Sequence, residues 1–477
     1  MKRHALGLIC AAGASLVVGA APAVAQNYVA GSDGSGDPFF PKAGNGGYDV
    51  SRYALELDYD QPQNVLTGKA TITARATQNL RRFNLDFRDF YAISSLKVNG
   101  ERAQLARPGP QELAVSPASN LEAGSQFTVE VVYSGKPKPI KDPDKSEEGW
   151  IPTDDGAFVV NEPQGSPGWY PVNDTPRDKA AYDFTVSVPA GKTVMANGEL
   201  VSHTSGNGKE TWRWREDTPM APYLATATNG TFQTRFYSTA SGLPMFDAVD
   251  PNTRRLRTDP PNPVLAFARL EPQEEIISFF SGLYGQYPFT TAGGIIDWAP
   301  DVGYALESQT RANYHRIPLP STVVHELAHQ WFGNAVTLAY WPDIWLNEGF
   351  ATWSEWIYDE RHGGPTAQAA HDERCAYAEG SADYDDLWFP APAALHHPSE
   401  LFHTPVYDRG AMTLQALRRR IGNDDTFFGI LRSWYSENRN GNVTTADFIA
   451  LAERETGEQL DAFFDDWLYE EGRPQDC

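Results

Sequence analysis

The hydrophobic periodicity of the sequence changes near residue 250, and this change constrains the fold more than any other feature. Between Tyr48 and Asp250, runs such as YALELDYD, KATITARAT and QFTVEVVYSG alternate apolar with polar residues, which is typical of half-buried β-strands. From Pro263 onward the apolar residues recur at helical spacing, as in EEIISFFSGLYGQY and DRGAMTLQALRRRIG. The pattern predicts an all-β sandwich or saddle domain over residues 48–250, followed by a mainly α domain over residues 251–477.

The N-terminus has the pattern of an export signal. A short basic start precedes an apolar run over residues 5–21, and residues 23–25 read Ala-Val-Ala, a signal-peptidase pattern. We expect removal of residues 1–25 as a signal peptide, so that residues 26–47, a Gly-rich leader, begin a secreted chain. A retained membrane anchor is the less favoured alternative, because the apolar run is short for a span. We expect no membrane span in the mature chain.

Charge and cysteine content narrow the possible partners. The chain has 62 acidic and 39 basic residues, a formal net charge of −23, so it would repel nucleic-acid phosphates and anionic lipid. We therefore expect no nucleic-acid partner. Beyond the signal peptide only Cys375 and Cys477 remain, and export favours a disulfide between them, with two free thiols as the alternative.

The stretch TVVHELAHQWFGNAVT, residues 322–337, carries the strongest chemical signal. On a helix, His325 and His329 would lie on one face and present both imidazoles to one zinc ion. Glu326 would lie close enough to act on a metal-bound water. Ser321 would be the N-cap of this helix. An amphipathic helix with incidental histidines is the alternative.

A third metal ligand is predicted after a gap of eighteen residues. Catalytic zinc takes three protein ligands and leaves one position open for water. Glu348 lies in WLNEGFATWSEW, where a second helix would bring its carboxylate beside the two histidines. Taken alone, Glu348 would be interpreted as a capping or surface carboxylate. The preceding motif favours its interpretation as a ligand.

These stretches resemble the zinc aminopeptidase family of aminopeptidase N and leukotriene hydrolase, gluzincins with this spacing of histidines and glutamate. NEPQGSPGWYPVNDTPRDKAAYDF, PVYDRGA and FFDDWLYEEGRP are similar to further stretches of that family. The resemblance implies a thermolysin-like catalytic domain with one zinc ion, bound by His325, His329 and Glu348. It also implies hydrolysis of the N-terminal peptide bond of peptides with a free N-terminus. Glu326 would be the general base, and Tyr407 would donate a hydrogen bond to the oxyanion.

The same resemblance implies which residues hold the free amine of the substrate. Glu307 lies in YALES, which keeps the glutamate of the family motif G-x-M-E-N but not its Gly, Met and Asn. Glu162, in the NEP stretch, matches a second amine-binding glutamate. Glu355 matches a carboxylate that orients a zinc-binding histidine. The altered neighbours Tyr304 and Leu306 would change the pocket for the first side chain.

Three further expectations concern the length of the chain, the alternative functions and a possible second metal site. The sequence stops at Cys477, where many family members continue into a helical domain, so we expect a short form with a more open cleft. A zinc endopeptidase and a catalytically dead binding homologue are the alternative functions. His396, His397 and His403 could bind a second metal, although a polar loop is the favoured interpretation.

Overall fold

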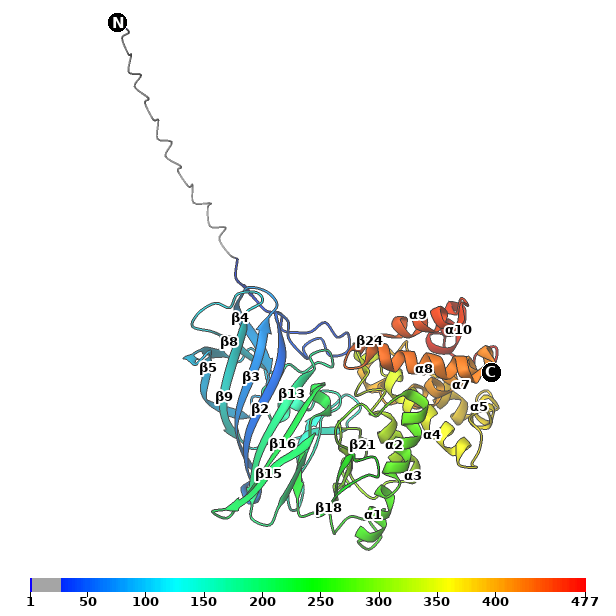
Figure 1. Cartoon of the computed structure of the whole chain (residues 1–477), viewed down its shortest axis with the longest axis horizontal. Helices are drawn as coiled ribbons and strands as arrows, with labels where there is room; N and C mark the ends of the chain where they lie inside the picture. Colours follow the sequence, from blue (N-terminus) through cyan, green and yellow to red (C-terminus); the bar gives the residue numbers. More distant parts are fainter. Residues whose placement is uncertain (2–26) are drawn as a thin grey trace.

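The computed structural model describes Met1 and residues 27–477, and it has a β-rich part followed by a helical part (Figure 1). This order confirms the predicted fold class. The predicted signal peptide lies outside the described residues, apart from Met1. None of the helices in the described part of the chain combines the length and the apolar character that a membrane crossing needs.

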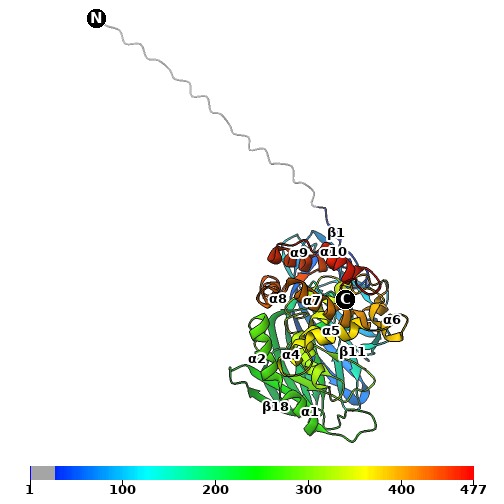
Figure 2. The same cartoon turned by 90° about the vertical axis from the view of Figure 1, so that its right-hand side faces the viewer.

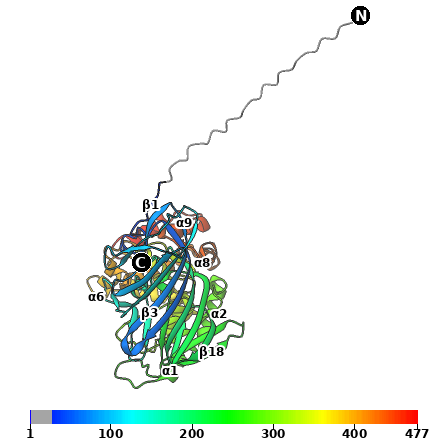
Figure 3. The same ribbon diagram turned by 90° about the vertical axis from the view of Figure 1, so that its left-hand side faces the viewer.

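The β-rich part is built around an eight-stranded sheet, whose strands lie towards the viewer in Figure 3. The strand order is β15-β16-β13-β2-β3-β9-β5-β6, and most of these strands are labelled in Figure 1. Strands β2 and β13 run parallel, and the other neighbouring pairs are antiparallel. The long strands alternate buried with more exposed residues, as a period of two predicts. The strands are β2 (Tyr48–Asp60), β3 (Val65–Ala76), β5 (Tyr91–Val98), β6 (Glu101–Arg102), β9 (Gln126–Gly135), β13 (Ala180–Pro189), β15 (Glu199–Gly206) and β16 (Lys209–Met220).

Two smaller sheets pack on the buried face of this sheet and complete a sandwich. Tyr48 of β2 contacts Phe83 with ring centroids 5.6 Å apart, and Tyr59 contacts Trp150 at 5.1 Å. One small sheet has the order β1-β4-β8-β7 and the other β10-β11-β12-β17-β14. Their strands are β1 (Val29–Ala30), β4 (Leu80–Asp86), β7 (Gln104–Ala106), β8 (Glu112–Ser116), β10 (Ile140–Lys141), β11 (Glu147–Pro152), β12 (Ala157–Val160), β14 (Thr193–Ala196) and β17 (Ala227–Gly230).

A further five-stranded sheet joins the two parts of the chain, in the order β18-β19-β20-β22-β21. The predicted domain boundary at residue 250 directly follows β19, within this sheet. The short strand β21 lies at its edge and leads into Glu307. The strands are β18 (Gln233–Ser238), β19 (Pro244–Val249), β20 (Gly294–Ile296), β21 (Ala305–Leu306) and β22 (Ala312–Tyr314).

Helices make up most of the remaining chain (Figure 2). The central one is α4 (Trp345–Arg361), which packs against α3 and α7. A Cβ atom on Gly349 would lie 2.8 Å from backbone atoms of Gly410, so α4 and α7 approach closely only because both positions are glycine. The other helices are α1 (Pro263–Leu270), α2 (Gln273–Tyr284), α3 (Pro320–Ala328), α5 (Ala367–Cys375), α6 (Ala382–Trp388), α7 (Gly410–Ile421), α8 (Asp424–Asn438), α9 (Thr445–Thr456) and α10 (Asp461–Phe464).

The C-terminal tail is tied to the helical part beside α5 (Figure 2). Cys375 and Cys477 form a disulfide across a sequence separation of 102 residues, which confirms the predicted pair. Trp467 Nε1 donates a hydrogen bond to Asp476 Oδ1 at 2.8 Å. A cross-link that closes a loop of this length stabilises the folded state by about 4–5 kcal/mol in a chain-entropy account.

Candidate active site

Helix α3 carries the two histidines on one face. The His329 N–H donates to the His325 carbonyl at 3.2 Å, and the ring centroids are 4.6 Å apart. The predicted Ser321 cap is wrong, because the N-cap residue is Leu319 and no side chain caps the helix. Pro320 begins the helix instead, at a position where the missing N–H of proline costs no hydrogen bond.

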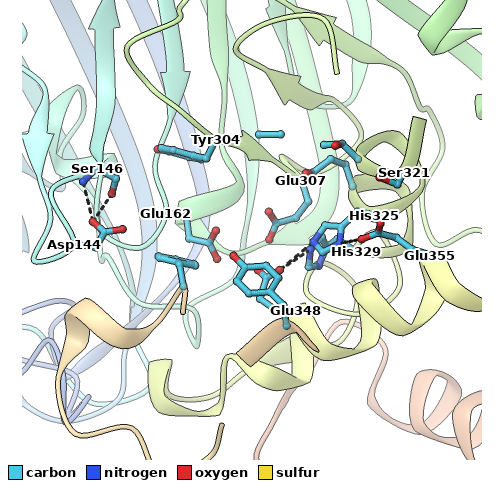
Figure 4. Close-up of a pocket in the computed structure, with 15 residues that line it drawn as sticks. Asp144, Ser146, Glu162, Tyr304, Glu307, Ser321, His325, His329, Glu348 and Glu355 are labelled. Carbon is cyan, nitrogen blue, oxygen red and sulfur yellow. Dashed lines mark hydrogen bonds and ion pairs between the residues drawn. The ribbon is translucent and has the colours of Figure 1, made fainter. Parts of the chain in front are cut away.

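Helix α4 brings Glu348 to the same point (Figure 4). Its Oε2 lies 3.0 Å from Nε2 of His325 and 3.4 Å from Nε2 of His329. These three side chains form a group whose donor atoms all lie within 4.8 Å of one another. Two imidazole nitrogens and one carboxylate, with a cavity on the open side, are the donor set of a catalytic zinc site.

The second nitrogen of each imidazole has its own partner. Nδ1 of His325 lies 2.7 Å from Oε1 of Glu355, and Nδ1 of His329 lies 3.0 Å from the Phe332 carbonyl. Acceptors at Nδ1 hold the protons there and leave both Nε2 atoms free to coordinate an ion. The donor set therefore fits a zinc ion in two respects. The donor atoms have the right spacing, and the imidazole rings are oriented with Nε2 towards the ion.

The histidines and carboxylates of this group shift one another's pKa. Burial acts to raise the pKa of Glu348, but the charges of His329 and His325 outweigh it and lower that pKa to about 2. Burial acts to lower the pKa of His329, and the carboxylates of Glu348 and Glu307 raise it to about 8. A metal ion would displace protons from these imidazoles, so its affinity would fall as the pH falls.

Glu326 is buried next to this group, with 4% of its surface exposed. Burial raises its pKa to about 8, although the charges of His325 and His329 act in the other direction. Glu326, Glu307 and His329 form a second set of potential ligands whose donor atoms lie within 4.8 Å of one another. A carboxylate in this position can accept a proton at near-neutral pH.

Tyr407 reaches the cavity from a π-helical turn, Pro405–Arg409. Its ring stacks on His325 with centroids 6.0 Å apart. Burial raises the pKa of the Tyr407 phenol well above its usual value, so the hydroxyl remains a hydrogen-bond donor. The turn is held by an ion pair of 2.8 Å between Asp408 and Arg374.

Two further carboxylates face the cavity, each with one oxygen that accepts no hydrogen bond in the described part of the chain. Glu307 and Glu162 are 2% and 6% exposed, and Oε1 of each accepts no hydrogen bond from any described residue. Burial raises the pKa of both groups, and the charge of Glu307 adds to the effect on Glu162. The Glu307 carbonyl accepts bonds from Gln330 and Asn334 at 3.0 and 2.7 Å, which fixes the backbone beside α3.

All these side chains line one cavity of about 390 Å³ (Figure 4). The structure thus brings together every site residue that the sequence predicted. The sequence analysis missed Asp144, Ser146 and Phe402, and no motif around them could have indicated a site. The lining residues are Asp144, Ser146, Glu162, Tyr304, Ala305, Glu307, Ser321, Thr322, His325, Glu326, His329, Glu348, Glu355, Phe402 and Tyr407.

The histidines before Tyr407 do not assemble a second metal site among the described residues. His396 pairs with Glu471 at 3.2 Å, and both side chains are exposed. His397 accepts a hydrogen bond from the Ser399 N–H at 3.1 Å. These contacts agree with the favoured interpretation of a polar loop.

Known protein families match most of the chain. The Peptidase M1 N-terminal domain matches residues 49–224, and the Peptidase family M1 domain matches residues 303–467. The chain belongs to peptidase family M1. This membership confirms the resemblance that the zinc motif and its spaced glutamate indicated.

Two aminopeptidases are similar to this chain in sequence. Aminopeptidase M1-D of Oryza sativa subsp. japonica is 26% identical over 339 residues, 64% of this chain and 36% of the relative. Glutamyl aminopeptidase of Bos taurus is 22% identical and aligns with 88% of this chain and 46% of the relative. The chain therefore spans less than half the length of these M1 relatives.

Solved M1 structures align over nearly their whole length. An M1 zinc metallopeptidase from Deinococcus radiodurans has a TM-score of 0.79 and 26% identity, and the match covers 93% of this chain and 99% of that one. A variant of the M1 zinc metallopeptidase from that organism, bound to a Tyr-Ser-Ala substrate, has a TM-score of 0.81 and 27% identity, covering 92% and 99%. A further match is described as a two-domain M1 zinc metallopeptidase.

Proposed function

We propose that this chain is a zinc-dependent aminopeptidase that removes the N-terminal residue of peptides. The observation that carries the proposal is that Glu307 and Glu162, both buried and both with an unpartnered oxygen, line the same cavity as the three-ligand group. Buried carboxylates without partners are costly unless a cation joins them. An α-ammonium is the cation that every unblocked peptide carries at its N-terminus.

The metal-binding residues would be His325, His329 and Glu348, with Glu355 holding the ring of His325. When bound, the zinc ion supplies Lewis acidity, which lowers the pKa of water and polarises the carbonyl of the scissile bond. The names of the relatives and of the solved structures support this choice of metal and of reaction.

Glu326 transfers the proton, and Tyr407 stabilises the developing negative charge. Glu326 accepts a proton from the attacking water and passes it to the nitrogen of the leaving amine. The Tyr407 hydroxyl donates a hydrogen bond to the carbonyl oxygen as negative charge develops there, where a fixed donor is most effective. Glu326 is buried and Tyr407 is partly buried, and both side chains line the cavity, which supports these roles.

Glu307 and Glu162, together called the amine anchor, determine which bond is cleaved. An α-ammonium bound by Glu307 and Glu162 places only the first peptide bond at the reacting groups, because the amine and that carbonyl belong to the same residue and lie a fixed distance apart. An endopeptidase has no use for two buried carboxylates at this point. The anchor thus favours an aminopeptidase over the endopeptidase alternative.

The test compares a hexapeptide that has a free amine with its N-acetylated twin, each with and without a chelator. Chelator-sensitive loss of the first residue from the free peptide alone is the expected result. Internal cleavage of both peptides would make the protein an endopeptidase. Absence of any cleavage by zinc-loaded protein would favour a binding homologue.

We also propose that the protein is exported. The basic start, the apolar run over residues 5–21 and the Ala-Val-Ala pattern support a cleaved signal, and the disulfide Cys375–Cys477 suits an oxidising compartment. N-terminal sequencing of protein collected outside the producing cells should begin at Gln26. Recovery of the chain only from the reducing interior, with residues 1–25 still attached, would contradict the proposal.

A further inference from the structure

The cavity has a strong excess of acidic groups. Six of its lining residues are carboxylates, and no lysine or arginine lines it. Five of the six have a role in the metal group, in proton transfer or in amine binding. The sixth, Asp144, has no such role. A role for Asp144 in binding substrate rests on the proposed aminopeptidase function.

Asp144 presents a fixed and unpaired oxygen to the cavity. Its Oδ1 accepts hydrogen bonds from the Ser146 N–H at 2.9 Å and from Ser146 Oγ at 2.7 Å (Figure 4). Its Oδ2 accepts none from the described residues, and Asp144 forms no ion pair with them. The side chain is therefore oriented by one oxygen and open to a ligand at the other.

Two aromatic rings line the same cavity as Asp144 and the amine anchor. Tyr304 and Phe402 both line the cavity. The Tyr304 hydroxyl donates to the Glu147 carbonyl at 3.1 Å, which joins the β21 segment to β11 next to Asp144. In the view of Figure 4, Glu162 and Tyr304 both lie between Asp144 and the two histidines.

We propose that Asp144 selects peptides whose N-terminal residue is lysine or arginine. With the α-amine at Glu162 and Glu307, the side chain of the first residue extends past Glu162 towards Asp144. Its aliphatic stem packs on Tyr304 and Phe402, and its cationic group reaches Oδ2 of Asp144. Aromatic faces also attract a cation that passes over them.

The negative charge of the cavity disfavours peptides that begin with an acidic residue. An N-terminal glutamate or aspartate would bring a carboxylate into a site that already holds Asp144 and Glu162, where the low local dielectric strengthens repulsion. A neutral side chain would fill the aromatic section and leave Oδ2 of Asp144 without a charged partner. Rates should therefore decrease from basic to neutral to acidic first residues.

The decisive comparison uses two peptides that begin with lysine or with norleucine and are otherwise identical. Norleucine keeps the aliphatic stem and lacks the ammonium group, while the α-amine is the same in both. The ratio of kcat/KM for lysine over norleucine should be about tenfold or more, as for a charge-assisted hydrogen bond. In Asp144→Asn the ratio should approach one, and Asn retains Oδ1 as an acceptor for Ser146.

A matched control removes one negative charge elsewhere. Asp154 is exposed in the turn between β11 and β12, outside the cavity. Asp154→Asn should keep the lysine-to-norleucine ratio of the natural chain. A natural ratio at or below one, or an unchanged ratio in Asp144→Asn, would overturn the proposal while leaving the aminopeptidase function intact.

A binding measurement separates this proposal from the function on which it rests. Zinc-loaded Glu326→Gln protein should bind lysine amide more tightly than norleucine amide in calorimetry, and adding Asp144→Asn should remove the difference. Equal binding of the two amides would overturn the role of Asp144. Failure of the natural protein to cleave either peptide would instead overturn the aminopeptidase proposal, and the calorimetric result would still decide whether Asp144 binds a cationic side chain.

Discussion

The cavity has two walls that differ in how their charges are satisfied. The catalytic wall consists of His325, Glu326, His329, Glu348 and Glu355 on α3 and α4. The recognition wall consists of Asp144, Ser146, Glu162, Tyr304 and Glu307, on loops and strand edges. In the catalytic wall the imidazoles pair with Glu348 and Glu355, whereas the recognition wall has unpartnered carboxylate oxygens.

This difference separates reactivity from selectivity. A change in the catalytic wall should slow every substrate alike, because the metal ligands and the general base act on the peptide bond itself. A change in the recognition wall should alter which peptides react, because its carboxylates contact the amine and the first side chain. Substitutions in each wall test that division, and the largest effect is expected at the general base.

Glu326→Gln should lower kcat by about 10³-fold for all peptides, because the amide cannot accept the proton of the attacking water. Zinc content, measured by mass spectrometry, should match that of the natural protein, since Glu326 is not among His325, His329 and Glu348. A loss that depends strongly on the first residue of the peptide would place Glu326 in the recognition wall and break the comparison.

Glu307→Gln should lower kcat/KM for free peptides by about 100-fold, because one of two charge-assisted bonds to the α-ammonium is lost. The slow background rate on an N-acetylated peptide should not change, since that substrate has no ammonium group. Steady-state kinetics on both peptides checks the prediction. Equal losses on the two peptides would mean that Glu307 acts on the peptide bond.

Glu355→Gln should weaken zinc affinity by about 10- to 100-fold, because the His325 imidazole loses the carboxylate that orients it at 2.7 Å. Titration with a competing chelator measures this change directly. At saturating zinc, most of the activity should return on every substrate. Activity that stays low at saturating zinc would show that Glu355 does more than hold the ring.

The two walls also differ in how far the sequence predicts them. Every residue of the catalytic wall lies in one segment of 31 residues. Helical spacing places His325 and His329 together, and the second helix of the same segment adds Glu348. Glu162 and Glu307 were found only through the resemblance, since nothing local to them indicates that β12 and β21 end at one cavity. Asp144 lies in DPDKSEE, a run that looks like any polar turn. Its exposure to the cavity depends on tertiary contacts such as that of Tyr304 with Glu147.

The smallest predicted effect is a change in stability at Asp142, which contacts the loop that carries Glu162. Gln164 donates from Nε2 to Asp142 at 2.9 Å and from its N–H to Glu148 at 3.0 Å, which holds the loop that carries Glu162. Burial raises the pKa of Asp142 from 3.8 to about 6, although hydrogen bonds from Glu148 and Gln164 act to lower it. The recognition wall thus rests on an aspartate that is costly to ionise.

Asp142→Asn should therefore stabilise the protein at pH 7 and leave its stability at pH 3.5 unchanged. The unfolded chain ionises Asp142 near pH 3.8 and the folded chain only near pH 6, so stability falls as the pH rises through that window and stays lower above it. The cost is at most on the order of 3 kcal/mol, so the melting temperature at pH 7 should rise by several degrees. The exposed control Asp154→Asn should show no such rise. A lower melting temperature for Asp142→Asn at pH 7 would mean that the ionised carboxylate contributes stability, and that the recognition wall is as fully satisfied as the catalytic one.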